Sequence, residues 1–147
     1  MRVPDYSKRI LALAEVLHRW IGQLMKLDGV RREKVALYAE EIAATLARAA
    51  EAHHLLEAEP VNGPAQRALV REFGRLSGYL ETIVGVLQRH LDGRKLAGVK
   101  RRLEQLRPSE TGMVYPVMLP ANRHHAAVDR LTAAEGYFRA LADALRA

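Results

Sequence analysis

Residues 35–56 read VALYAEEIAATLARAAEAHHLL, and this stretch decides the fold class. Its apolar residues recur in steps of three and four, and they do not alternate as those of a half-buried strand do. This spacing places them on one face of an α-helix. The face consists of Val35, Tyr38, Ile42, Leu46, Ala49, His53 and Leu56. We therefore expect an amphipathic helix that ends before Pro60.

The residues before this stretch repeat the same period. A cap at Asp5 or Ser7 opens the preceding helix, and Asp28-Gly29 ends it. Its stripe consists of Ile10, Ala14, Leu17, Ile21 and Leu24, widened by Leu13, Trp20 and Leu27. Because the turn is short, the first two helices should form an antiparallel hairpin.

Three further helices complete the pattern. Gly63 and Pro64 are placed as the N-cap and first turn of the third helix. The apolar stripe of this helix consists of Leu69, Phe73, Leu76, Leu80, Ile83 and Leu87. A short basic helix with Leu96, Val99, Leu103 and Leu106 lies between Asp92-Gly93 and Pro108. The last helix begins near Asn122, and its apolar stripe consists of Ala127, Leu131, Ala134, Phe138, Leu141 and Leu145. The sequence predicts an all-α, antiparallel up-and-down bundle of four long helices plus one short basic helix, as a single domain over residues 1–147.

Composition narrows the class of protein. The absence of cysteine excludes disulfides and thiolate metal sites, and fits a reducing compartment. The start, MRVPDYSKR, does not have the pattern of a secretory signal, and no stretch of about 18 uncharged apolar residues could span a bilayer. We therefore expect a cytoplasmic protein without a membrane span.

The net charge of +6 is concentrated in residues 61–120, where ten Lys and Arg oppose five Asp and Glu. On the expected third helix, three interior glycines fall opposite the apolar stripe, beside arginines. Because each costs about 1 kcal/mol relative to alanine, they suggest a surface that a backbone approaches closely. The predicted nucleic-acid or partner-binding residues are Arg67, Arg71, Gly74, Arg75, Gly78, Gly85 and Arg89, continued by Arg94, Lys95, Lys100, Arg101 and Arg102. An ordinary solvated face is the alternative.

The segment 108–120, PSETGMVYPVMLP, departs from the helical pattern because its three prolines exclude a helix. Its large apolar side chains either close one end of the core or contact another chain. Met113, Tyr115 and Met118 are the candidate interface residues.

Two Glu-x-x-His pairs, Glu15 with His18 and Glu51 with His54, have the spacing of carboxylate-bridged metal sites. In the expected hairpin the pairs are separated by about 20 Å along the axis, so we expect no metal and no cofactor. His124 and His125, at the start of the last helix, are expected at the surface or in an interface.

The sequence favours a non-catalytic role, because it contains no nucleophile elbow, phosphate-binding loop or dinucleotide fingerprint. Arg48 and His53 resemble the Arg-x4-His spacing of the HEPN ribonucleases, which would imply metal-independent cleavage of RNA. Five helical residues rotate the pair by about 140°, so their side chains should not converge in one subunit. His53 also falls on the core stripe, where we expect it to be a packing residue.

RILALAEVLHRW (9–20) and KLAGVKRRLEQL (95–106) resemble helices of the HeLo-type four-helix-bundle domains of cell-death and immune signalling proteins, over about a sixth of the chain. By class, the chain is also similar to the small helical subunits of CRISPR effector complexes. Either resemblance implies a non-catalytic module within a larger assembly.

Three functional hypotheses remain open. The first is a non-enzymatic module whose basic surface over residues 67–107 binds an acidic partner, with nucleic acid favoured. The second is a protein-interaction or homo-oligomerisation module that uses the glycines and the 108–120 segment. The third is the HEPN-like ribonuclease.

Overall fold

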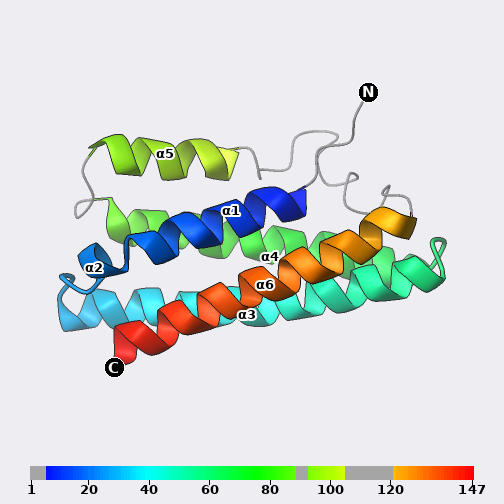
Figure 1. The fold of residues 1–147 in the computed structure, drawn as a ribbon, viewed down its shortest axis with the longest axis horizontal. Coiled ribbons are helices and arrows are strands. Elements are labelled where there is room, and N and C mark those ends of the chain that lie inside the picture. Colours follow the sequence, from blue (N-terminus) through cyan, green and yellow to red (C-terminus); the bar gives the residue numbers. More distant parts are fainter. Residues whose placement is uncertain (1–5, 89–92, 105–120) are drawn as a thin grey trace.

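The computed structural model describes residues 6–88, 93–104 and 121–147 (Figure 1). They form α1 (Tyr6–Arg19), α2 (Ile21–Leu24), α3 (Gly29–Ala58), α4 (Gly63–Leu87), α5 (Gly93–Glu104) and α6 (Ala121–Arg146). These described residues contain no strand. The predicted all-α fold with four long helices and one shorter basic helix is confirmed.

Apart from the single turn α2, consecutive helices alternate in direction along the bundle (Figure 1). α3 packs most extensively against α6 and α4, α1 lies against α6, and α5 lies against α4 and α1. α5, which lies between α4 and α6 in the chain, runs back along the bundle. The long helix α6 therefore runs parallel to α1. The N-terminal ends of α1 and α6 therefore lie beside the C-terminal end of α3.

α3 is the central helix, and its buried surface is wider than one stripe. The predicted stripe is buried apart from Tyr38, which is half-buried. Further alanines outside that stripe are buried as well: Ala36, Ala39, Ala43, Ala50 and Ala52. Small side chains let helix backbones approach closely, so α3 can contact α6, α4 and the start of α1 at once.

The first expected helix is divided into α1 and α2, which corrects the prediction of one continuous helix. Trp20 leaves helical geometry with φ −92° and ψ 13°. Its N–H bonds to the Leu17 carbonyl at 3.2 Å, the tighter i to i−3 pattern of a closing turn. Leu24 and Leu27 nevertheless remain buried.

Side-chain caps mark two helix starts. Asp28 Oδ1 accepts a hydrogen bond from the Arg31 N–H at 2.9 Å, and Asn62 Oδ1 accepts one from the Ala65 N–H at 3.0 Å. The prediction of Gly63 as a cap was wrong, because glycine has no side-chain acceptor and Asn62 supplies one.

The helix starts predicted at Ser7 and Asn122 are not caps in the structure. Ser7 is not the cap of α1, because it lies buried inside the helix. Asn122 lies within the first turn of α6. The alternative cap Asp5 and the whole segment 108–120, with Met113, Tyr115 and Met118, lie outside the described residues.

Within the described part of the chain, every helix is too short or too polar to cross a bilayer.

Candidate functional site

The outward face of α4 carries the predicted basic surface. Arg67, Arg71 and Arg75 are exposed, and so are Gly78 and Gly85. We call these five residues the basic strip. The opposite face of α4 is buried from Leu69 to Leu87. The sequence therefore placed the basic strip on the correct side of the helix.

α5 packs against α4 and adds exposed basic side chains on the neighbouring helix. These are Arg94, Lys100 and Arg101. Arg89 and the side chains of Lys95 and Arg102 lie outside the described residues. Gly74, at the edge of the basic strip, is half-buried.

Among the described residues, nothing packs over the exposed glycines of the basic strip. A Cβ atom added at Gly78 or Gly85 would meet no atom within 4 Å. Each glycine costs the helix about 1 kcal/mol relative to alanine. The packing of the described part of the chain therefore gives no reason for either glycine.

Arg75 is held at the edge of the basic strip that borders α3. Its Nη2 donates to the Tyr79 hydroxyl at 3.3 Å, and its Cζ lies 6.0 Å from the Tyr79 ring centroid. The hydrogen bond that Arg75 donates to the Tyr79 hydroxyl raises the pKa of Arg75 above its usual value. Tyr79 in turn packs at 45° against Tyr38 of α3, with ring centroids 5.9 Å apart. The spacing of four residues between Arg75 and Tyr79 is the sequence pattern that indicates this contact.

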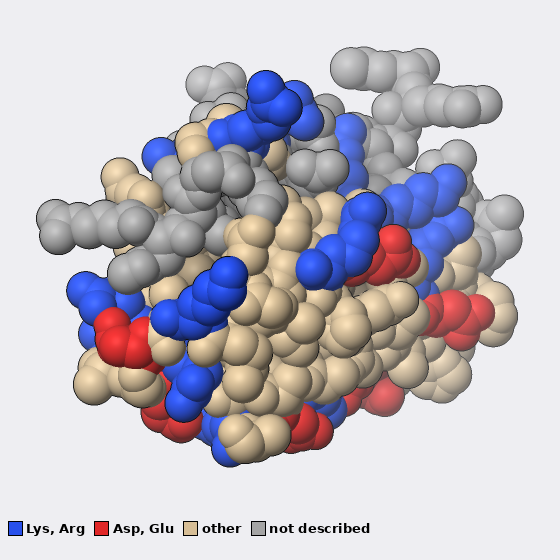
Figure 2. All heavy atoms as spheres, turned by 60° about the vertical axis from the view of Figure 1, so that its left-hand side comes forward, with Lys and Arg blue, Asp and Glu red and all other residues tan. Residues whose placement is uncertain are grey.

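The surface charge is mixed where Figure 2 brings the α2 end of the bundle forward. Lys and Arg side chains surround an uncharged area, and acidic side chains lie among them. Particular basic residues, and not the net charge alone, therefore decide whether this protein has a basic binding face.

Comparison with family models, curated proteins and solved structures finds no match to this chain.

A second cluster lies at the end of the bundle where α3 ends and α6 begins. His53 is fully buried and His124 is 1% exposed, and their Nδ1 atoms lie 2.8 Å apart. The Tyr6 hydroxyl is hydrogen-bonded to His53 Nε2. The prediction that His53 packs in the core is confirmed. The expectation for His124 was wrong: it precedes Ala127 and Leu131 by three and seven residues, so it falls on the buried stripe of α6.

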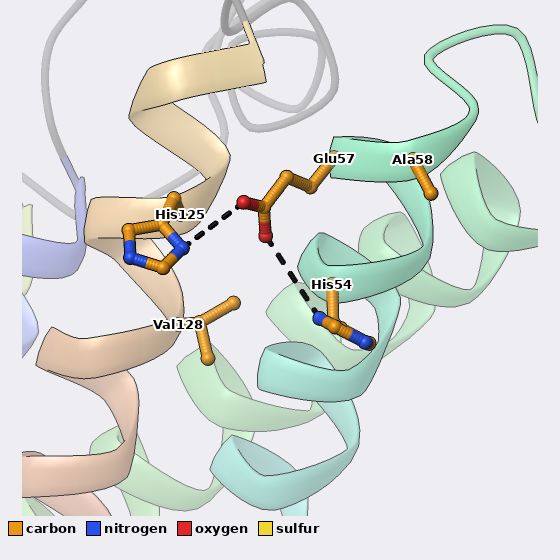
Figure 3. Close-up of a pocket in the computed structure, with 5 residues that line it drawn as sticks. All are labelled: His54, Glu57, Ala58, His125 and Val128. Atoms are coloured by element: carbon orange, nitrogen blue, oxygen red, sulfur yellow. Dashed lines mark ion pairs between the residues drawn. The ribbon is translucent and has the colours of Figure 1, made fainter.

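The neighbouring histidines of both helices point outward and share one carboxylate (Figure 3). Glu57 Oε1 lies 3.0 Å from His125 Nδ1, and Glu57 Oε2 lies 3.8 Å from His54 Nδ1. With Ala58 and Val128 they line a shallow surface pocket of about 400 Å³. Both imidazoles are two-thirds exposed, so water screens these ion pairs.

Arg48 and His53 face different neighbours. Arg48 Nε donates to Glu72 Oε1 on α4 at 2.9 Å, whereas His53 faces α1 and α6. The structure therefore does not bring the two side chains to one reaction centre within the chain. Glu72 is 5% exposed, and its Oε2 is a buried oxygen without a hydrogen-bond partner among the described residues.

The two Glu-x-x-His pairs also remain apart. Glu15 and Glu51 are exposed, and His18 packs against Tyr137 of α6 with ring centroids 5.5 Å apart. Since Tyr6 contacts His53, His18 lies twelve residues further along, about 18 Å at 1.5 Å per residue. Across the described ranges, no three metal-ligating side chains are grouped so that they could hold an ion.

Proposed function

We propose that this chain is a non-catalytic helical-bundle module that binds the phosphate backbone of nucleic acid through the basic strip of α4 and the exposed basic residues of α5. The observation that carries the proposal is the combination of exposed arginines with glycines that the fold does not require. A row of arginines supplies charge for phosphates, and the missing side chains at Gly78 and Gly85 allow a backbone to come close.

The arrangement favours backbone contact over reading of base sequence. Arginine side chains on one helix face provide sequence-independent attraction that weakens steeply with salt. The aromatic side chains beside the basic strip, Tyr38 and Tyr79, are half-buried and packed against each other, so neither ring is free to stack on an unpaired base. We therefore expect duplex or structured nucleic acid to bind better than an unpaired strand.

The test measures binding of a labelled duplex by fluorescence anisotropy between 50 and 200 mM salt. The variant combines Arg67→Ala, Arg71→Ala, Arg75→Ala and Arg101→Ala. It should lose at least about tenfold in affinity at the lower salt concentration, and its slope of log K against log salt should fall by about three to four units.

A matched control removes the same charge elsewhere. Lys8, Arg19, Lys26 and Lys34 are exposed on α1, on α3 or between α2 and α3, and replacing all four by alanine also lowers the net charge by four. This control should retain most of the affinity. Equal losses of affinity in both variants would mean that binding depends only on net charge. Absence of duplex binding by the parent would refute the proposal.

A second candidate rests on the open space over Gly78 and Gly85, which equally suits a helix of a second protein or of a second copy. Gly78→Leu separates the two candidates. Loss of self-association in this variant, with the arginine variants behaving as the parent, would favour a homo-oligomerisation or adaptor module. Apolar association would also show little weakening in salt, in contrast to phosphate binding.

A further inference from the structure

The end of the bundle that carries α2 exposes apolar side chains that the core does not bury. Val30, in the first turn of α3, is 73% exposed, and Met25, just after α2, is 36% exposed. Trp20 and Ile21, at the start of α2, are half-buried and pack against the core. We call these four residues the apolar tip. It lies at one extremity of the bundle, where α2 ends and α3 starts (Figure 1).

The turn that carries the apolar tip is anchored in the fold. Leu24 and Leu27 are 1% and 5% exposed, and the Leu27 N–H donates to the Leu24 carbonyl at 3.1 Å. From α3, Arg32 Nη1 donates to the Met25 carbonyl at 3.4 Å, which holds the start of α3 against the end of α2. Met25 and Val30 are therefore displayed on packed backbone.

Basic side chains surround the apolar tip. Residues 19–34 contain five Lys and Arg against two Asp and Glu. Both acids are paired with arginines, Asp28 with Arg31 and Glu33 with Arg146. Figure 2 brings this end forward and shows Lys and Arg around an uncharged area, with acidic side chains among them. Three exposed basic residues of the segment form no ion pair with a described residue: Arg19, Lys26 and Lys34.

The opposite end of the bundle has similar apolar exposure but the opposite charge. Val61, between α3 and α4, is 83% exposed, and Leu55, near the end of α3, is 43% exposed. Residues 51–62, however, contain three Glu and no Lys or Arg. Of these two ends, only the one with the apolar tip is therefore attracted to an anionic surface.

An anionic lipid bilayer fits this combination of groups. Its acyl region receives apolar side chains, and its negative headgroups attract the Lys and Arg around them. A tryptophan beside basic residues is typical of a membrane–water interface. Val30 stands out at the extremity of the bundle and does not line a groove that could receive the helix of an acidic protein.

We propose that the apolar tip docks this protein on anionic lipid bilayers. Met25 and Val30 lie at the boundary between headgroups and acyl chains, and the exposed basic residues around them lie among the headgroups. The nucleic-acid surface proposed on α4 and α5 is a separate surface, so either proposal can fail without the other.

Co-sedimentation with lipid vesicles tests the apolar contacts. The vesicles contain phosphatidylcholine with or without about 30% phosphatidylserine. The parent should bind the anionic vesicles, and Met25→Gln combined with Val30→Gln should lose about tenfold in partition coefficient. The matched control, Leu55→Gln combined with Val61→Gln, removes similarly exposed side chains from the acidic end and should bind as the parent does. No binding by the parent, or equal losses in the two variants, would overturn the proposal.

Two variants of equal net charge test the basic contacts. Replacing Lys8, Arg19, Lys26 and Lys34 by alanine removes three cations beside the apolar tip. It should weaken vesicle binding at least about 30-fold, since each cation near the surface contributes about fivefold. The variant that removes four arginines from α4 and α5 should keep most of the vesicle binding. Equal losses on vesicles would refute docking through the apolar tip, whereas vesicle binding without duplex binding would refute only the proposed function.

The single tryptophan of the chain reports directly on the apolar tip. Anionic vesicles with brominated acyl chains should quench the fluorescence of Trp20, because it lies at the docked end. Unquenched Trp20 in vesicle-bound protein would show that another face binds. A changed oligomeric state of the Met25 and Val30 variant without lipid would assign the apolar tip to a contact between copies. Binding of soluble polyglutamate as strong as that of vesicles would assign it to an acidic protein, and any of these three results would overturn the proposal.

Discussion

Arg146 in the last turn of α6 binds Glu33 in the first turns of α3. Its Nη2 lies 2.8 Å from Glu33 Oε1, and its Nε donates to the same carboxylate at 3.1 Å. A further contact joins Arg146 to Glu40. These contacts tie the helices together at the end of the bundle opposite the buried histidines.

Replacing Arg146 by alanine should raise the pKa of Glu33. The hydrogen bonds from Arg146 hold this pKa below its usual value, so the pair stabilises the fold above the ordinary pKa of about 4.3 and loses this effect as the pH falls through the lowered value. NMR titration of the Glu33 carboxyl carbon measures the change. Arg139→Ala, which removes a partner of Glu135 instead, is the control and should leave Glu33 unaffected.

Alanine at Leu17, Ile42, Leu80 or Leu131 should destabilise the protein by about 2 to 5 kcal/mol. Each of these side chains is at most 2% exposed, so truncation removes buried surface and leaves a cavity. Chemical denaturation followed by circular dichroism gives the free energy of unfolding. Leu37→Ala is the control, because Leu37 is 47% exposed and should cost less than about 0.5 kcal/mol. Losses of that small size at the four core positions would show that the bundle is packed differently.

Gly78→Ala and Gly85→Ala should each stabilise the isolated chain by about 0.5 to 1 kcal/mol. The added methyl group meets open space, and the unfolded chain loses conformational freedom. Gly136→Ala on α6 is a matched control, since its site is equally open and lies outside the basic strip. All three should raise the midpoint of denaturation similarly. A loss of stability at Gly78 or Gly85 alone would mean that these sites are already covered, as in a self-associated state.

Arg48→Ala should destabilise the fold by about 1 to 3 kcal/mol, less than for a fully buried pair because Arg48 is 45% exposed. The change leaves the buried Glu72 carboxylate without its cation. Combining it with Glu72→Leu should recover most of the loss, because no buried charge then remains. Denaturation of the single and double variants tests this coupling. A double variant less stable than Arg48→Ala would contradict this account of the pair.

The helical fold could be predicted because helix formation leaves a local trace in the sequence. The spacing of Leu69, Phe73 and Leu76 predicts their common face without knowledge of any neighbour. The same helical period of 3.6 residues places the basic strip opposite this apolar face, toward solvent. The burial of His53 was predictable for the same reason.

The remaining features depend on neighbours that are distant in the chain. His53 and His124 are 71 residues apart, and neither local pattern reveals that α3 and α6 place them in contact. The break at Trp20 sits inside an apolar stripe that continues unchanged to Leu24, so periodicity alone could not locate it. The joining of α1, α3 and α6 at one end required the three-dimensional arrangement.

The broad contact between α3 and α6 has a consequence for biosynthesis. α3 leaves the ribosome shortly before α4, but α6 follows only after residues 59–120 have been made. Until then, the alanine-rich surface that α6 will cover stays open, although α4 can already pack on α3 and α5 on α4. Docking of α6 must therefore be a late event in folding, and a ribosome stalled before residue 121 would present a half-built bundle to chaperones and proteases.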